Sequence, residues 1–187
     1  MSGQRLLVGP LMSEAEAALW VCDEELQQAA SFGTEQRRRE FLTWRAMLRR
    51  ELGRELKIGY NELGAPVLPE REEHLSVSHA ADRVAILLSM QPTGVDIERM
   101  SRRYHRILHK YLTPAEQALS SDIRFYAAAW CAKEAAYKWA GIRDLGFEEV
   151  EILCYDNDRI TLRVRGGEPL RLVVEQLDEE YIMSYII

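Results

Sequence analysis

The chain has 187 residues, a formal net charge of −6 and 47% hydrophobic residues, a composition that provides a packed core and argues against intrinsic disorder. The acidic balance argues against broad nucleic-acid binding, and three cysteines without a Cys-x-x-Cys pair suggest neither a disulfide framework nor a zinc site. No apolar run approaches the ~20 residues of a membrane helix, and no signal peptide is visible. We therefore expect a cytoplasmic monomer that binds neither nucleic acid nor membrane.

The first part of the chain predicts a strand and two helices. Residues 5–9 have the pattern of a short strand. A capping-box pattern at Ser13 predicts a helix that continues towards Ala30. Thr34 can cap a second helix, which we expect to end at Leu52 because Gly53 is a typical stop residue.

Arginines are concentrated in the second predicted helix. Arg38, Arg45 and Arg49 are spaced seven and four residues apart, so at about 100° per residue they fall on a narrow stripe. Most such charge runs are solvated faces, and from the helix alone we favour that interpretation. The alternative is an anion site, because the Arg guanidinium matches phosphate geometry.

Extended sequence follows. Asn61–Pro69 is turn-rich and leads into an extended segment. Leu75–His79 and Val84–Ser89 predict two strands joined by a short turn. Residues 91–94 have the composition of a linker between two lobes.

The stretch Gly94–Arg99 places two carboxylates close together. Successive side chains of a strand point to opposite faces, so Val95 and Ile97 can enter a core while Asp96 and Glu98 leave on the other side. An oxygen-seeking cation such as Mg²⁺ would neutralise this pair. For this stretch alone, a half-buried strand with a solvated acidic face is the simpler interpretation.

Residues 101–112 mix basic and apolar side chains and precede a strong helix start at Thr113-Pro114. This segment could dock an acidic partner helix or form a solvated amphipathic helix. The residues alone favour neither interpretation.

The helix predicted over Phe125–Gly141 is alanine-rich and so apolar that we expect it to be buried on most sides. Asp122 can cap its start. Glu134 and Lys138 lie four residues apart on one face, either as a stabilising helix pair or as a metal carboxylate with an ammonium over a phosphate. Lys133 points about 100° away from Glu134, so we give it a secondary role. The tail predicts strands at 148–154, 159–164, 170–174 and 181–187.

Two of these stretches together resemble a known signature. Gly-Val-Asp-Ile-Glu at 94–98, followed by Trp-x-x-Lys-Glu-Ala-x-x-Lys at 130–138, is similar to the paired motif of 4′-phosphopantetheinyl transferases, in particular the single-chain surfactin-synthetase-activating type. The resemblance covers about residues 37–154. It implies an α+β fold of two similar lobes, here 1–93 and 94–187, each with a small antiparallel sheet packed on helices.

The resemblance implies Mg²⁺-dependent transfer of 4′-phosphopantetheine from coenzyme A to a serine of an apo acyl or peptidyl carrier protein, with Mn²⁺ as an alternative ion. Adenosine 3′,5′-bisphosphate is the second product. Two positions depart from the family pattern, since Ala65 replaces a usual Lys and Ala80 replaces a usual Ser. The implied sites are the metal ligands Asp96, Glu98 and Glu134; the catalytic residues Glu134 and Lys138; the coenzyme A contacts Arg38, Arg45, Arg49, Gly64, Pro66, Ser78, His79 and Lys138; and the carrier-protein contacts Arg103, Arg106, Leu108, Tyr111 and Leu112.

Two other functions stay open at this point. Another Mg²⁺-dependent phosphotransferase could use the same carboxylates without the nucleotide contacts of Arg45 and His79. A non-catalytic module that binds carrier proteins could keep the two lobes and lack a working metal site.

Overall fold

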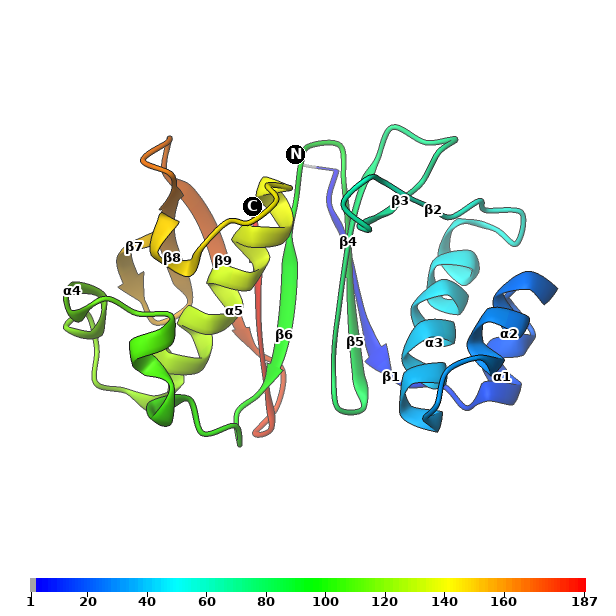
Figure 1. Ribbon diagram of the computed structural model, residues 1–187, viewed down its shortest axis with the longest axis horizontal. Helices are drawn as coiled ribbons and strands as arrows, with labels where there is room; N and C mark the ends of the chain where they lie inside the picture. The colour runs from blue at the N-terminus through cyan, green and yellow to red at the C-terminus, as the bar shows by residue number, and fades with distance from the viewer. Residues whose placement is uncertain (1–2) are drawn as a thin grey trace.

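Three antiparallel sheets organise the computed structural model, which describes residues 3–187 (Figure 1). The first sheet has the order β1-β5-β4, the second has the order β6-β10-β9-β8-β7, and β2 pairs with β3 in a short ribbon. The predicted α+β class, with antiparallel sheets packed on helices, is confirmed. The strands are β1 (Arg5–Pro10), β2 (Gly59–Tyr60), β3 (Pro66–Val67), β4 (His74–Ala80), β5 (Arg83–Ser89), β6 (Val95–Arg99), β7 (Val150–Asp156), β8 (Arg159–Val164), β9 (Leu170–Gln176) and β10 (Tyr181–Ile186).

The N-terminal helices begin at local capping residues. The single helix expected between Ser13 and Ala30 is wrong, because two helices occupy this region: α1 (Glu14–Ala18) and α2 (Asp23–Ala30). Each begins with its own capping arrangement, and the second starts where the Glu25 carboxylate accepts the Cys22 amide. The third helix, α3 (Glu35–Leu52), starts at Thr34 and ends at Gly53, as predicted.

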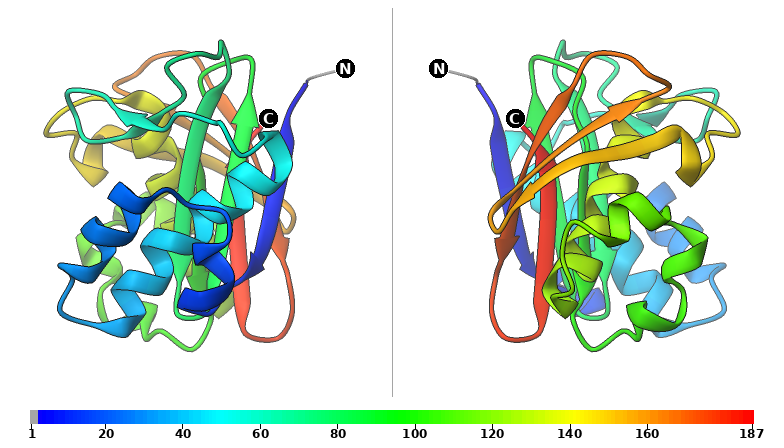
Figure 2. Two further views of the ribbon diagram at one scale, coloured as in Figure 1. Left: turned by 90° about the vertical axis from the view of Figure 1, so that its right-hand side faces the viewer. Right: turned by 90° about the vertical axis from the view of Figure 1, so that its left-hand side faces the viewer.

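Helix α3 lies between the first sheet and the pair α1–α2 (Figure 2). Trp44 and Leu48 pack on Ile86 of β5, in a cluster that closes one side of the helix. On the other side, Phe41 and Leu42 pack against small residues of α1 and α2. Because both sides are buried, apolar residues occur on two sides of this helix instead of in one stripe.

Helix α5 (Ile123–Ala140) covers the second sheet. Asp122 caps its start, and Gly141 ends it in the left-handed conformation, with φ 55°. Its alanine-rich sides pack on Ile152, Leu162 and Ile182 of the sheet. The helix expected from Phe125 to Gly141 is thus confirmed, with its first turn two residues earlier.

The segment 101–112 forms short turns where its mixed basic and apolar composition could have formed a helix. Residues 101–112 form two short 3₁₀ turns, η1 (Tyr104–Arg106) and η2 (Leu108–Lys110), followed by α4 (Pro114–Gln117). A continuous amphipathic helix is therefore wrong for this segment. Another 3₁₀ turn, η3 (Phe147–Glu149), leads into β7.

The two sheets meet where β4 lies beside β6 (Figure 1). Val95 and Ile97 pack with Ala85 and Leu87 of β5, so the apolar side of β6 closes the contact between the sheets. The boundary predicted after residue 93 falls in the passage from β5 to β6 and stays a prediction. Among residues 3–187, no helix is both long and apolar enough to cross a bilayer.

Candidate functional site

The backbones of β6 and α5 touch at the residue before β6. A Cβ on Gly94 would lie 1.9 Å from the Ala135 carbonyl oxygen, so any larger residue would force the strand away from the helix. This approach puts Asp96 and Glu98 opposite the helix side that carries Glu134 and Lys138. The glycine of the motif therefore has a packing reason that bears directly on the site.

Asp96 is buried, with 6% of its surface exposed. Its Oδ1 accepts hydrogen bonds from Ser78 Oγ at 2.7 Å and from Lys138 Nζ at 2.8 Å. Its Oδ2 is buried and has no hydrogen-bond partner among residues 3–187. A buried carboxylate oxygen without a partner is costly unless a bound group satisfies it.

Glu98 accepts two short hydrogen bonds and lies near a tyrosine hydroxyl. Its Oε1 accepts from Trp130 Nε1 and from Arg102 Nη1, both at 2.8 Å. The Tyr104 hydroxyl lies 3.4 Å from Oε2. Burial raises the pKa of Glu98, and the charge of Asp96 raises it further, against the opposing effect of Arg102.

Glu134 shares this environment from the helix side. Burial raises the pKa of Glu134, Asp96 and Glu98 raise it further, and Lys138 lowers it. The three predicted carboxylates thus act on one another electrostatically. Within the described residues 3–187, however, no three acidic, His or Cys side chains converge as a ready-made metal site.

The donor set nevertheless fits a divalent ion. Carboxylate oxygens are the ligands that Mg²⁺ and Mn²⁺ prefer, and the unpartnered Oδ2 of Asp96 lacks the partner that such an ion would supply. Mg²⁺ commonly uses one or two carboxylates together with substrate phosphates. Oxygens of a phosphate ligand could complete the coordination, so the metal assignment stays a prediction.

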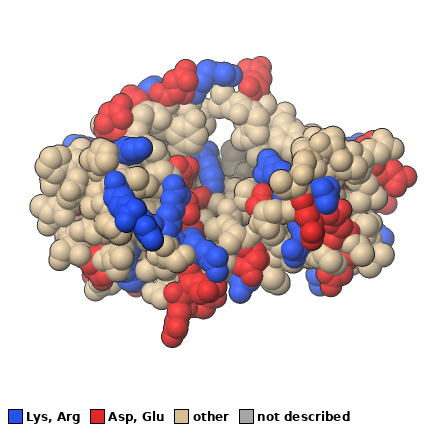
Figure 3. All heavy atoms as spheres, turned by 60° about the horizontal axis from the view of Figure 1, so that its bottom comes forward, with Lys and Arg blue, Asp and Glu red and all other residues tan. Residues whose placement is uncertain are grey.

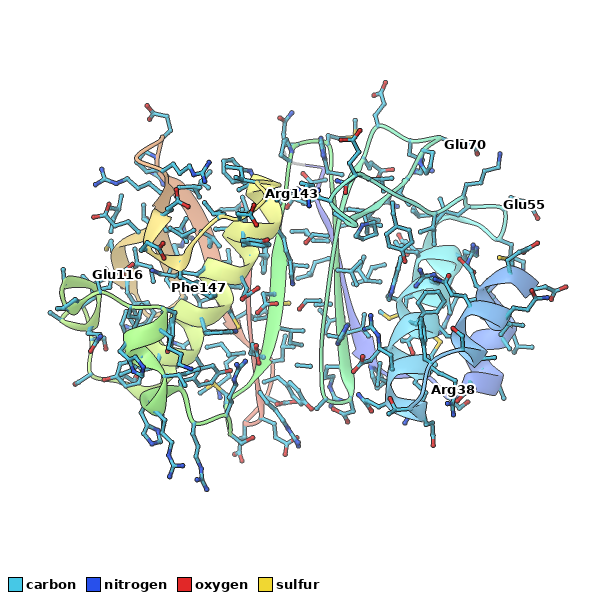
Figure 4. The ribbon with its side chains drawn as sticks, viewed as in Figure 1. Arg38, Glu55, Glu70, Glu116, Arg143 and Phe147 are labelled. Atoms are coloured by element: carbon cyan, nitrogen blue, oxygen red, sulfur yellow. The ribbon has the colours of Figure 1, made fainter. Side chains whose placement is uncertain are left out.

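Lys133, the other charged residue of the motif, faces away from this cluster. It forms an ion pair with Glu116 at 2.8 Å and donates to the Phe147 carbonyl at 3.1 Å. Glu116 and Phe147 are labelled in Figure 4. Both charged side chains are almost completely buried. Lys133 therefore fastens α5 to α4 and η3.

A cavity of about 480 Å³ lies between the two halves of the chain. It is lined by Gly64 and Pro66 from one half, and by Tyr137, Lys138 and Arg143 from the other. The position of Arg143 at the end of α5 is visible in Figure 4. Figure 3 shows acidic and basic side chains gathered around the hollow between the halves.

A second cavity, of about 180 Å³, shares the lining residues Pro66 and Val77 with the first. Arg37, Arg45 and His79 also line it. The structure therefore brings together three of the predicted coenzyme A residues. It also adds Arg37, whose Nη1 lies 3.3 Å from His79 Nε2 and which the arginine stripe had not selected. Burial lowers the pKa of His79.

The arginine stripe itself is not a solvated face. Arg45 and Arg49 are only 1% and 5% exposed, which makes that interpretation wrong for both. Arg49 donates two bonds to the Glu25 carboxylate, at 2.6 and 3.0 Å. Arg38 is paired with Glu14 on α1 and lines neither cavity.

A third, mostly apolar cavity of about 240 Å³ lies beside the carboxylate cluster. Glu134, Leu145, Phe147 and Val150 line it, and Tyr137 forms a wall common to this cavity and the first. The first cavity, which Lys138 lines, therefore shares lining residues both with the cavity at the Arg37–His79 pair and with the cavity at Glu134.

The predicted carrier-protein contacts divide by burial. Arg103 and Arg106 are exposed and Leu108 is half-buried. Tyr111 and Leu112 are 2% and 4% exposed and belong to the core around α5. These two side chains support the segment from beneath, so their assignment to an accessible surface is wrong.

Comparisons with known proteins place this geometry in a family. The model of the 4′-phosphopantetheinyl transferase superfamily matches residues 92–186, just over half of the chain. A 4′-phosphopantetheinyl transferase of Bacillus subtilis is 26% identical over 138 residues, which are 69% of this chain and 62% of that protein. Enterobactin synthase component D of Escherichia coli K12 is 31% identical over 121 residues, 60% of this chain and 58% of that protein. The aligned regions thus span about three fifths of these relatives. The family match includes β6 and α5 with all three carboxylates, and the chain belongs to the 4′-phosphopantetheinyl transferase superfamily.

Proposed function

We propose that this chain transfers 4′-phosphopantetheine from coenzyme A to a serine hydroxyl of an apo acyl or peptidyl carrier protein, as a single-chain enzyme of the surfactin-synthetase-activating type. One observation carries the proposal. Lys138 donates to the buried Asp96 carboxylate, and the other Asp96 oxygen, also buried, has no hydrogen-bond partner among residues 3–187. The similarity to a 4′-phosphopantetheinyl transferase of B. subtilis supports the same activity.

The adjoining cavities suit a long ligand with an anionic end and a less polar end. We propose that the 3′-phosphate of coenzyme A lies near Arg37 and His79, in the cavity that Arg45 also lines, and that the nucleotide occupies the cavity lined by Gly64 and Pro66. The pantetheine arm would then enter the apolar cavity beside Glu134. This path brings the diphosphate past Lys138 and the carboxylates.

In the reaction, the serine oxygen forms a bond to the phosphorus that carries pantetheine, and the bond from that phosphorus to adenosine bisphosphate breaks. Glu134 would take the serine proton, since its raised pKa brings its proton affinity closer to what a general base needs. Lys138 would stabilise charge on the departing phosphate. Asp96, Glu98 and Glu134 would hold Mg²⁺ or Mn²⁺, which neutralises charge on the diphosphate when bound.

The carrier protein would meet the exposed part of residues 102–108. Arg103 and Arg106 supply positive charge, and the half-buried Leu108 supplies an apolar contact. Carrier proteins of this class are acidic, as the family resemblance implies. Opposite charges of this kind accelerate encounter more than they add to affinity.

The proposal is tested by incubating the protein with coenzyme A, Mg²⁺ and an apo carrier protein, followed by intact-mass measurement. We expect the carrier to gain one phosphopantetheine, and we expect no gain with Asp96→Ala. A carrier that binds without any mass change would instead identify a binding module. Turnover of another phosphorylated substrate, with none of coenzyme A, would identify a different phosphotransferase.

A further inference from the structure

Two serines of β4 join the first sheet to the edge of β6. Ser76 Oγ accepts the Val95 amide at 3.0 Å, and Ser78 Oγ accepts the Ile97 amide at 3.3 Å. Both serines are buried. Because they lie two residues apart on one strand, their hydroxyls point to the same side and satisfy alternate amides of β6. In this respect the two serines are equivalent.

They differ in what their hydroxyl protons do. Ser78 Oγ donates its proton to Asp96 Oδ1 at 2.7 Å. A hydroxyl has one proton, so this bond commits the donor capacity of Ser78 to Asp96. Among residues 3–187, Ser76 makes no such bond to Asp96, and the two donors to Asp96 Oδ1 are Ser78 and Lys138.

Both donors to Asp96 act on the same oxygen. Lys138 comes from the helix and is partly exposed, with 29% of its side chain accessible, whereas Ser78 is buried in the contact between the sheets. A carboxylate without fixed donors can rotate about its terminal bond, because that torsion has broad minima. With Oδ1 held by a buried hydroxyl, Oδ2 is left as the oxygen without a protein partner.

We propose that Ser78 is a positioning residue for Asp96, and that its hydroxyl holds the carboxylate so that Oδ2 is presented to a divalent cation. The inference rests on the metal role of Asp96 in the proposed function. It gives the Ser78 side chain a task other than the coenzyme A contact predicted from the sequence. It also means that the first sheet contributes to a centre whose carboxylates all come from the second half of the chain.

The experiment compares Ser78→Ala with Ser76→Ala. Both variants remove a hydroxyl that accepts a β6 amide, so both loosen the contact between the sheets in a similar way. Only Ser78→Ala also removes a donor to Asp96. Free Mn²⁺ is measured by electron paramagnetic resonance in the presence of saturating coenzyme A, and thermal melting is recorded for each protein.

We expect Ser78→Ala to raise the Mn²⁺ dissociation constant about tenfold or more, the scale on which partners of metal ligands tune affinity. Ser76→Ala should change it by less than about twofold at a similar melting temperature. Ser78→Cys keeps the volume but donates weakly, and it should show the same loss if the alanine variant does not fold.

Equal loss of Mn²⁺ affinity in the two alanine variants would overturn the proposal, because the effect would then belong to the contact between the sheets. Wild-type affinity in Ser78→Ala, or no Mn²⁺ binding by the wild-type protein, would also overturn it. The mass assay is scored separately. Absence of transfer together with the Ser78-specific loss of Mn²⁺ affinity would reject the proposed reaction and leave the positioning role standing.

Discussion

Helix α5 carries two lysine–carboxylate pairs in two different regions of the molecule. Towards α4, Lys133 pairs with Glu116, and the side chains are 1% and 2% exposed. The remaining capacity of Glu116 is used by the Ile152 amide at 2.7 Å and the Thr113 amide at 2.7 Å. Both oxygens of Glu116 thus have hydrogen-bond partners, and we call such a pair saturated. This pair stabilises the packing of α5 against α4 and β7.

Towards the first sheet, Lys138 pairs with Asp96 at the same distance of 2.8 Å. Here one carboxylate oxygen has no partner within the described residues 3–187, the charge of Asp96 acts on Glu134, and Lys138 lines a cavity. A lysine–carboxylate pair therefore has a structural role in one region and indicates a ligand site in the other. A complete set of hydrogen bonds indicates stability, whereas an incomplete one beside a cavity indicates a place for a ligand.

The largest effect should come from the incomplete pair. Asp96→Ala should lower transfer by about 10³-fold or more, since a group that supports charge in the transition state is lost. The fold should survive, because the buried oxygen without a partner disappears as well. Intact-mass kinetics and thermal melting test this expectation. Full turnover by the variant, or by the wild-type protein in excess chelator, would contradict the metal assignment.

Glu134→Gln should lower transfer by about 10²–10⁴-fold, the contribution of a general base. The same variant should be more stable than the wild-type protein at neutral pH, although its activity falls. The folded state raises the pKa of Glu134, so it binds protons more readily than the unfolded chain, and stability falls as pH rises from 4.5 through the raised value.

The variant should therefore melt at or above the wild-type temperature at pH 7, and this advantage should vanish in acid below pH 4.5. A Glu134→Gln protein that melts lower and turns over normally would show that the residue is a structural helix partner. Lys138→Met is the companion variant. It should slow transfer without unfolding α5, because most of its apolar stem is kept.

The saturated pair should respond in stability. Lys133→Met leaves Glu116 buried without its cation, which costs about 3–5 kcal/mol of unfolding free energy. The double variant Lys133→Met/Glu116→Gln should recover part of this loss, because no uncompensated charge remains. Urea unfolding measures both. If Lys133→Met folds with wild-type stability and loses only activity, the contrast between the two pairs is wrong.

A similar contrast exists among the arginines of α3. Arg37→Ala should weaken coenzyme A more than dephospho-coenzyme A, by about 1.5–3 kcal/mol or one to two decades, since it loses a charge-assisted hydrogen bond to the 3′-phosphate. Arg45 donates to the Phe41 carbonyl and the Tyr60 hydroxyl, so it belongs with Arg49 in this contrast. Arg49 is paired with Glu25. Arg49→Ala should therefore weaken the binding of both ligands equally and lower the melting temperature. Calorimetric titration of the two ligands separates these outcomes, and selective loss in Arg49→Ala would restore the assignment made from the sequence.

The smallest effect concerns exposed charges. Reversing Arg103 and Arg106 to Glu should raise the apparent KM for the carrier protein, leave that for coenzyme A unchanged, and matter less at high salt, because exposed charges are screened beyond about 8 Å at physiological ionic strength. Arg171→Glu, on the exposed side of β9, is the control. Unaltered carrier kinetics at low salt would remove this segment from the interface.

Much of the fold could be predicted because its signals are local. Thr34, Asp122 and Gly141 mark helix ends through bonds to residues within one turn, and the hairpins of the second half follow from alternation around short turns. Periodicity places Asp96 with Glu98 on one face of a strand and Glu134 with Lys138 on one face of a helix. The resemblance to the paired motif then selects these four as site residues. These features require only neighbouring residues.

Only the tertiary structure decided which charges are saturated. Arg49 pairs with Glu25, which lies 24 residues away in the chain. Lys133 pairs with Glu116 on a different helix. Ser78 donates to Asp96 across the contact between two sheets. Periodicity cannot supply such pairs, because the distance between two elements depends on how all the others pack. The sequence by itself thus determined which groups could carry the chemistry, and packing determined which of them are left without a partner to do so.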